Sequence, residues 1–383
     1  MNAVAFLDLA AACAEVQPEL DIAFRRVSAS GRYLFGEELD GFEAEFAAYN
    51  GVGHCAGVGS GFDALALGLR ALGVRPGDEV LVPGNAPAVT WAAVAAVGAV
   101  PVGVEPDETT MTMDPAGLEP ARTARTRAVV PVHLYGRPAA MDAVTDWARR
   151  HGVAVLADAA QAHGATFGGL AAGALADATA WSFYPSKNLG ALGDGGAVTS
   201  EDGAVAARVR RLRNYGAEGR DRLVEVGTNS RLDELQAAFL RVRLRHLDLW
   251  NTRRRTAAAR YRRELADLPL VLPPDDDAVV QSAWHLFVVR LSGRDDVRAA
   301  LGQRGIDTLV HYPVPPFAQE AFGGLGVGAD AFPVARRLAR EVLSLPFGPH
   351  LAAHQQGRVI EELAVVLGEG RRSRAGTAGS GGA

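Results

Sequence analysis

From Glu79 onward the chain alternates short apolar runs with helix-like segments, and this rhythm constrains the fold more than any other feature. The run E-V-L-V-P precedes a helical pattern at 89–97, the run A-V-V-P-V-H-L-Y-G precedes another at 141–151, and a further strand pattern then ends at Asp158. Strands that alternate with helices pair in parallel, and right-handed crossovers place the helices on both faces of the sheet. The sequence therefore predicts an α/β fold with a mainly parallel sheet.

A glycine-rich turn between a strand pattern and a helix pattern lies upstream of this region. In H-C-A-G-V-G-S-G-F-D-A-L-A-L-G-L, from His54 to Leu69, the amides of Ser60, Gly61 and Phe62 fall at the start of the helix. Unpaired N–H groups and a partial positive charge suit a phosphate there. A dinucleotide loop is the alternative, but G-x-G-x-x-G is incomplete because Phe62 stands where a glycine is needed. The turn favours a single phosphate group.

Lys187 and Asp158 form a candidate reactive pair. Lys187 lies in W-S-F-Y-P-S-K-N-L-G-A-L-G-D-G-G-A-V, an apolar and glycine-rich setting in which an ammonium tends to lose its proton. A neutral amine is what Schiff-base chemistry requires. Asp158 ends the run V-A-V-L-A-D, and open α/β sheets bind ligands at the carboxyl ends of their strands. Taken singly, Lys187 has a plain interpretation as a surface-loop residue and Asp158 as a helix cap; their spacing allows both to reach one ligand.

The composition excludes several classes of protein. Of 383 residues, 48% are hydrophobic and 22% charged, which argues against global disorder, and the formal net charge of −5 offers no basic surface for nucleic acid. Cys13 and Cys55 stand in no metal-binding spacing, so we expect free thiols and no metal. The first residues lack the pattern of a signal peptide, and no long apolar stretch follows. We expect a soluble cytoplasmic protein that does not interact with membranes.

Composition changes along the chain predict its domains. We expect a large domain at 1–250 that includes an N-terminal lead-in, a smaller C-terminal α/β domain at 251–367, and a disordered tail at 368–383 that is rich in Gly, Ser and Arg. A long helix is expected to begin at Asn229 or Ser230 and to run past Trp250.

Two long motifs, D-A-A-Q-A-H-G and S-F-Y-P-S-K-N-L-G-A-L-G-D-G-G-A-V, resemble those of the DegT/DnrJ/StrS nucleotide-sugar aminotransferases. The resemblance extends from about Phe6 to Leu367. It implies an aspartate-aminotransferase-like fold (fold type I) and pyridoxal 5′-phosphate (PLP) as cofactor, with pyridoxamine phosphate as the amino-carrying form.

The resemblance also implies roles for single residues. Lys187 would carry the cofactor and move the proton, Asp158 would pair with the pyridinium nitrogen, and Gln161 would lie against the cofactor. Ser182 would reach the phosphate, unless it is a plain strand serine. Asn229 would reach the phosphate bound by the partner in a homodimer with shared sites; N-capping by Asn229 or Ser230 is compatible with that role.

Residues on the sugar side are less distinctive. Tyr215 in R-N-Y-G, and His311 with Tyr312 in H-Y-P-V-P, resemble residues near the sugar, with plain packing as the alternative. One segment departs from the family pattern: Ala86 and Pro87 stand where Thr and an aromatic residue that covers the cofactor ring are expected. Trp91 is the candidate to replace that aromatic residue through a shifted backbone; the alternatives are a cofactor that is held less tightly, or a site that leaves space for a bulkier substrate.

The function implied by the resemblance is transfer of an amino group from L-glutamate to the ketone of a nucleotide-linked keto-deoxysugar. The branch that it resembles most aminates C-3 of dTDP-3-keto-6-deoxyhexoses, sugars of antibiotics and surface glycans. A keto-cyclitol aminotransferase is one alternative, and a non-catalytic regulatory or assembly protein, which would need neither Lys187 nor Asp158, is another. Sugar dehydratases of this fold carry histidine in place of the lysine, so Lys187 argues against that activity.

Overall fold

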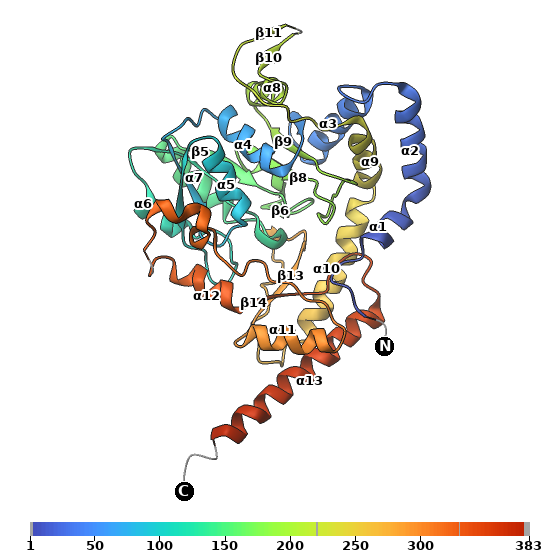
Figure 1. Cartoon of the computed structure of the whole chain (residues 1–383), viewed down its shortest axis with the longest axis vertical. Helices are drawn as coiled ribbons and strands as arrows, with labels where there is room; N and C mark the ends of the chain where they lie inside the picture. The colour runs from blue at the N-terminus through green and yellow to red at the C-terminus, as the bar shows by residue number, and fades with distance from the viewer. Residues whose placement is uncertain (1–2, 220, 329, 379–383) are drawn as a thin grey trace.

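The fold is that of a computed structural model, which describes residues 3–219, 221–328 and 330–378. Its central sheet has the strand order β1-β9-β8-β5-β4-β2-β3 (Figure 1). The strands of this sheet are β1 His54–Val58, β2 Glu79–Pro83, β3 Val100–Val104, β4 Thr126–Val129, β5 Ala154–Asp158, β8 Ala178–Ser182 and β9 Gly196–Ser200. Neighbouring strands from β8 to β3 pair in parallel, and β9 runs antiparallel to both β1 and β8. The predicted α/β class and mainly parallel sheet are confirmed.

Helices cover both faces of this sheet (Figure 1). On one face an apolar core joins the sheet to α4, α5 and α8, and on the other a core around Trp181 and Phe183 joins it to α3 and α9. The helices of this part are α1 Leu9–Glu15, α2 Gln17–Ser30, α3 Glu37–Tyr49, α4 Gly61–Ala71, α5 Ala88–Ala96, α6 Leu118–Ala121, α7 Met141–His151, α8 Gly203–Leu212, α9 Glu234–Leu244 and α10 Leu247–Glu264. A sheet that is covered by helices on both faces needs strands with apolar side chains on both faces.

Shorter elements complete the chain. Beyond α10 lie β13 Phe287–Arg290, α11 Arg294–Gln303, α12 Pro333–Glu341, β14 Val342–Leu345 and α13 Ala353–Ala378, where β13 pairs antiparallel with β14. A small sheet joins β6 Thr166–Phe167, β7 Leu170–Ala171 and β12 Val280–Gln281. The strands β10 Ala217–Glu218 and β11 Arg222–Leu223 form a hairpin that projects from the body at the top of Figure 1.

The predicted start of the long helix was wrong. Helix α9 begins at Glu234, and its cap is Asp233, whose side chain accepts a hydrogen bond from the Gln236 N–H at 2.7 Å. Ser230 is unavailable as a cap because its hydroxyl accepts from the Gly59 N–H at 2.9 Å and donates to Asp63 at 2.8 Å. The helix also ends at Leu244, and α10 begins separately at Leu247.

The predicted boundary near residue 250 falls inside α10. Trp250 packs in a core with α2 and α9, whereas Tyr261, further along the same helix, packs in the core of the C-terminal part. The first residues join that C-terminal part too, since Val4 forms a bridge with Ile306 and shares its core. Helix α10 therefore contributes side chains to the cores of both parts of the molecule.

Helix α13 reaches into the segment for which the sequence predicts disorder. Helix α13 continues to Ala378, so the backbone of 368–378 is helical, and residues 379–383 of the expected tail lie outside the described residues. Val359 and Leu363 anchor the first turns of α13 in the core, and an anchored helix extends through residues such as Ala and Arg without a new nucleation cost. Among the described residues no helix is both long and apolar enough to cross a membrane.

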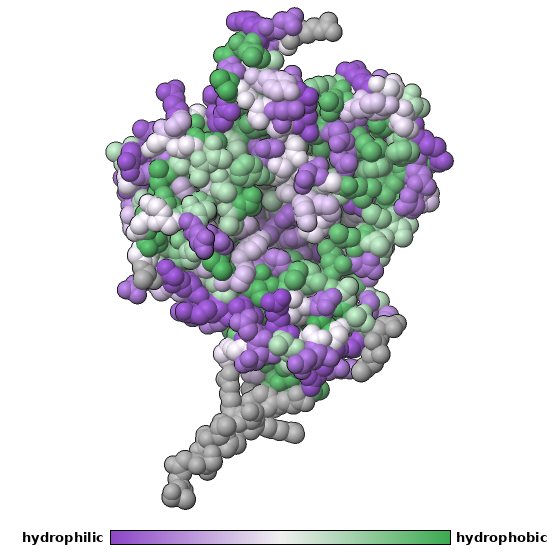
Figure 2. All heavy atoms as spheres, viewed as in Figure 1, coloured by the Kyte–Doolittle hydropathy of each residue, from purple (hydrophilic) through white to green (hydrophobic). Residues whose placement is uncertain are grey.

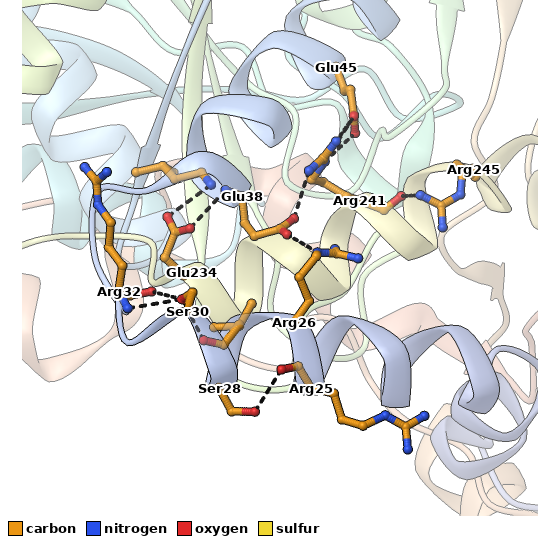
Figure 3. Close-up of polar contacts among 12 residues, drawn as sticks. Arg25, Arg26, Ser28, Ser30, Arg32, Glu38, Glu45, Glu234, Arg241 and Arg245 are labelled. Atoms are coloured by element: carbon orange, nitrogen blue, oxygen red, sulfur yellow. Dashed lines mark hydrogen bonds and ion pairs between the residues drawn. The ribbon is translucent and has the colours of Figure 1, made fainter.

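Helices α2, α3 and α9 are joined by polar contacts (Figure 3). Glu38 on α3 forms ion pairs with Arg26 on α2 and with Arg241 on α9. The buried carboxylate of Glu234 accepts from the N–H groups of Gly36 at 2.8 Å and Glu38 at 2.9 Å, at the start of α3. These contacts hold α3 against α9, which covers the sheet beneath the Lys187 loop.

Candidate active site

The predicted site residues gather at the carboxyl edge of the sheet. Asp158 ends β5 and lies opposite Ala180 on the neighbouring parallel strand β8, which ends at Ser182. Ser182 pairs with Gly196, and Gly196 also pairs with Val58 at the end of β1. The strand order therefore brings the Asp158 segment, the Lys187 loop and the turn before α4 to one edge, where open sheets bind ligands.

Asp158 is a buried carboxylate, with 4% of its surface exposed. Its side chain accepts hydrogen bonds from the Thr90 hydroxyl at 2.9 Å and from the Ala160 N–H at 3.1 Å. Burial raises the pKa of Asp158, while these two donors and the positive charge of Lys187 act in the opposite direction. A buried carboxylate in this position is stabilised by a further cation.

Lys187 lies in the loop between β8 and β9, where its backbone N–H donates to the Tyr184 carbonyl at 2.9 Å. Burial lowers the pKa of Lys187 to about 8, and the charge of Asp158 opposes that shift. The amine and the carboxylate thus lie close enough to influence each other's ionisation. At neutral to mildly basic pH a useful fraction of Lys187 is the uncharged nucleophile.

The start of α4 lies directly against Ser182. Ser60 caps this helix by accepting from the Asp63 N–H at 3.1 Å, which leaves Gly61 and Phe62 in the first turn, where helix N–H groups lack intrahelical partners. A side chain at Gly61 would bring its Cβ within 2.5 Å of the Ser182 Cβ, so glycine permits the contact. Phe62 contributes its backbone to this turn, while its ring packs on the core.

Gln161 has both ends of its amide engaged. Its carbonyl oxygen accepts from the Tyr135 N–H at 2.6 Å, and its NH₂ donates to the Tyr312 hydroxyl at 3.1 Å. Tyr312 lies within the field of Asp158, which together with burial raises its pKa. His311 accompanies it: its Nδ1 is 2.8 Å from the Ser344 hydroxyl, and burial and the Lys187 charge lower its pKa to about 4. The H-Y-P-V-P segment therefore borders the Asp158–Lys187 pair.

Asn229 and Tyr215 lie toward the exterior. Asn229 is exposed and forms a bridge with Asn214. The ring of Tyr215 is half exposed and lies 4.9 Å from the guanidinium of Arg231. No hydrogen bond or ring contact within the described residues joins either side chain to Lys187 or Asp158.

Comparison with known proteins identifies this arrangement. The model of the DegT/DnrJ/EryC1/StrS aminotransferase family matches residues 15–364. The chain belongs to this family. It is accordingly a PLP-dependent aminotransferase, as the sequence motifs implied.

Several relatives of this DegT/DnrJ/EryC1/StrS aminotransferase cover nearly the whole chain. It is 54% identical over 360 residues to the erythromycin biosynthesis sensory transduction protein EryC1 of Saccharopolyspora erythraea, covering 94% of this chain and 98% of that protein. It is 54% identical over 362 residues to the dTDP-3-amino-3,4,6-trideoxy-alpha-D-glucose transaminase of Streptomyces venezuelae, with 94% of each covered. The crystal structure of S. venezuelae DesV with a ketimine intermediate superposes with a TM-score of 0.93 at 52% identity, covering 95% of this chain and 98% of that one.

The residues present in this aminotransferase fit PLP. Asp158 is nine-tenths buried and its two hydrogen-bond donors are neutral, so a protonated ring nitrogen would supply a charged donor. The first turn of α4 and Ser182 offer N–H and hydroxyl donors suited to a phosphate. When bound, PLP supplies an electron sink that stabilises negative charge on the carbon next to the transferred nitrogen.

The structure corrects the interpretation of Trp91. This side chain is 0% exposed, its indole N–H donates to the Pro83 carbonyl at 3.0 Å, and its ring packs against Phe317 and Phe322 in the core. It has no free face for a cofactor ring and does not replace the aromatic residue missing at Pro87. Pro87 itself is the residue before α5 and is partly exposed.

Thr90, directly before Trp91, is a site residue that the sequence reasoning missed. Its buried hydroxyl donates to Asp158. The sequence carries a weak signal for this residue, because Thr90 begins a Thr–aromatic pair close to the expected one.

Proposed function

We propose that Lys187 is the residue that holds PLP and that Asp158 pairs with the protonated ring nitrogen. One observation carries this assignment: Lys187 is the only lysine in the 383-residue sequence. A PLP aminotransferase needs a lysine amine to bind its cofactor and to move the proton. The pKa of Lys187 is lowered to about 8, so its Nζ is uncharged at a higher pH. This amine would take the proton from the substrate carbon that bears the nitrogen and deliver it to a different atom.

The remaining predicted contacts complete this proposal. The amides of Gly61 and Phe62, with Ser60 and Ser182, would bind the phosphate. Gln161 would present to the cofactor the NH₂ proton that it does not donate to Tyr312, since its carbonyl accepts from Tyr135. His311 and Tyr312, which border the pair, are proposed on the substrate side. Tyr215 stays a weaker candidate for the same role.

We also propose that two copies share their sites. Asn229 is exposed, and the neighbouring hairpin carries apolar side chains on its surface, with Val226 85% exposed. Figure 2 shows hydrophobic atoms on this protrusion, at the place of β10 and β11 in Figure 1. Exposed apolar side chains beside Asn229 favour contact with a second copy of the chain. Asn229 would then reach the cofactor phosphate that this second copy binds.

The proposed acceptor is the C-3 ketone of a dTDP-linked 3-keto-6-deoxyhexose, and the proposed donor is L-glutamate. The name of the S. venezuelae transaminase, with a 3-amino sugar linked to dTDP, supports this acceptor, and its high identity over nearly the whole chain favours a related substrate here. A keto-cyclitol is the second candidate acceptor. Cys13 and Cys55 are both free thiols, which fits a reaction in the cytoplasm.

One experiment tests acceptor and donor together. The holoenzyme is incubated with glutamate and either dTDP-keto-sugars or keto-cyclitols, and the mass change from ketone to amine is measured. We expect amination of a dTDP-3-keto sugar; turnover of the cyclitols alone would reject the proposed acceptor. Borohydride reduction and peptide mapping test the lysine, since every covalently fixed cofactor should lie on the peptide that contains Lys187.

A further inference from the structure

The residue after the proposed cofactor lysine is buried and fully hydrogen-bonded. Asn188 is 4% exposed. Its Nδ2 donates to Asn251 Oδ1 at 2.9 Å and to the Ala283 carbonyl at 2.8 Å, and its Oδ1 lies 3.1 Å from Nδ1 of His285. Because both amide protons are donated, Oδ1 is the acceptor, and His285 must carry its proton on Nδ1.

The partners of Asn188 come from outside the Lys187 loop. Asn251 lies on α10, and Ala283 and His285 lie in the segment that leads into β13. The loop also closes on itself, since a Cβ at Gly190 would lie 2.5 Å from the Pro185 carbonyl oxygen. The backbone thus shapes the loop, and Asn188 fixes where the shaped loop lies relative to the rest of the molecule.

Asn251 connects this loop to the segment that follows Asp158. Asn251 is 1% exposed, and its Nδ2 donates to the His163 carbonyl at 2.8 Å. Gly164 allows this approach, since a Cβ there would lie 2.4 Å from Asn251 Nδ2. The Asn251 side chain therefore contacts both the loop that carries Lys187 and the segment that follows Asp158.

From this geometry we infer that Asn188 and Asn251, with the Nδ1–H of His285, form a hydrogen-bond network that positions Lys187 relative to Asp158. We call this network the positioning relay. The inference rests on the proposed role of Lys187. One hydrogen bond joins the two amides, and each amide also bonds to other segments; such a chain of bonds is a precise spacer because each N–H···O bond fixes both distance and direction. A misplacement of about 1 Å near reacting atoms can cost about a hundredfold in rate, so such spacing matters to the reaction.

Several charged and titratable groups lie around Lys187. They are Asp158 at the end of β5, His163 in the following segment, His285 before β13, His311 near Tyr312, and Arg254 on α10, whose charge acts on His163 and His285. Burial and the Lys187 charge lower the pKa of His163 to about 3 and that of His311 to about 4, so both rings are neutral at the working pH. With a pKa lowered to about 8, Lys187 changes its charge close to neutral pH.

The test uses apoprotein made with lysine carrying ¹³C at Cε, which yields one lysine side-chain signal because the sequence contains one lysine. The pKa of Lys187 is read from that signal, and the rate of PLP capture is read by absorbance. In Asn188→Ala and in Asn251→Ala we expect the loop to loosen and admit water. Better solvation of the ammonium then raises the pKa of Lys187 above about 8, and capture at neutral pH slows by about tenfold.

The control is Asn50→Ala, which removes a buried amide that donates to the Phe46 carbonyl at 2.9 Å in α3. This variant should lose thermal stability without changing the Lys187 signal. The double variant Asn188→Ala/Asn251→Ala should capture PLP no more slowly than the worse single variant, because both changes break one relay. Full additivity, or a wild-type pKa and capture rate in both single variants, overturns the inference.

A second pair of variants keeps the test decisive if the asparagine variants do not fold. His285→Phe keeps a ring but removes the donor to Asn188, whereas His285→Asn restores an N–H at the Nδ1 position. Capture should fall in the first variant and recover in part in the second; equal rates in the two would reject the relay. Failure of wild-type apoprotein to bind PLP at Lys187 would instead reject the proposed function, so the two failures are distinguishable.

Discussion

The proposed chemistry depends on the ionisation of Lys187, and two physical causes shift its pKa in opposite directions. Burial lowers the pKa of the amine to about 8, and Asp158 favours the ammonium. In wild-type apoprotein the rate of PLP capture should therefore rise with pH up to about 8 and then level off, because the neutral amine is the nucleophile. Asp158→Asn removes the opposing charge, so the inflection should move to lower pH. Stopped-flow absorbance at a series of pH values measures both; an inflection that moves upward would contradict this assignment of causes.

Thr90 gives a second prediction for a single residue. Its hydroxyl donates to a buried, charged acceptor, and such hydrogen bonds contribute about 1.5–3 kcal/mol. Thr90→Val should therefore weaken PLP binding by about tenfold to a hundredfold, since Asp158 is left with one donor fewer and ionises less readily. Thr90→Ser retains the hydroxyl and serves as the control. Equilibrium dialysis measures the affinity of both variants for PLP. Equal affinity of the Val and Ser variants would show that the Thr90 hydroxyl does not contribute to the site.

The contrast between Thr90 and Trp91 shows where sequence reasoning stops at the residue scale. Both lie in α5, a helix with apolar residues all around, and successive side chains on a helix point about 100° apart. The spacing of residues alone does not reveal which of the two faces the sheet edge. The tertiary packing decides, because the C-terminal rings of Phe317 and Phe322 occupy the side that Trp91 faces.

At the scale of elements, the start of α3 depends on a residue almost two hundred positions away. Glu234 accepts from the N–H groups of Gly36, Glu38 and Leu39, which a helix terminus leaves without internal partners. Glu234→Ala should cost about 2 kcal/mol and lower the melting temperature, since buried N–H groups are left unsatisfied. Glu37→Ala, an exposed change in the same first turn, is the matched control. A melting temperature as high for Glu234→Ala as for this control would show that water replaces the carboxylate.

Elements with strong periodicity were predictable, whereas their caps and joints were not. The sheet strands, α5 and α7 lie close to the predicted positions because apolar runs bounded by Gly and Pro are local signals. Asn229, Ser230 and Asp233 are all good capping residues, and the choice of Asp233 follows from tertiary partners of Ser230 that no local pattern contains. The same limit hid Asn188 and Asn251, whose amides meet only once the chain is folded.

For the molecule as a whole, the distribution of basic residues is informative. With Lys187 as the only lysine, the described surface ion pairs are made by arginine and histidine, such as Arg241 with Glu38 and Arg253 with Glu15. Guanidinium groups stay protonated and do not form Schiff bases under ordinary conditions. Carbonyl compounds, including the proposed keto-sugar, therefore meet one reactive side-chain amine, which directs covalent chemistry to a single place.

The assembly of two copies gives the last prediction. If Asn229 serves the partner's phosphate, Lys187→Ala destroys the site of its own subunit, whereas Asn229→Glu destroys that of the other by placing a carboxylate against the phosphate. Mixing the two inactive variants under conditions that allow subunit exchange should restore activity, because each mixed dimer has one site with an intact Lys187 and an intact Asn229. Since half of the dimers would be mixed and each would have one complete site, we expect about a quarter of the wild-type rate. Recovery should disappear when Asn229→Glu is mixed with a Lys187→Ala/Asn229→Glu double variant. If the first mixture stays inactive while native mass spectrometry, with one variant isotope-labelled, shows that exchange has occurred, Asn229 belongs to the site of its own subunit and the shared site is wrong.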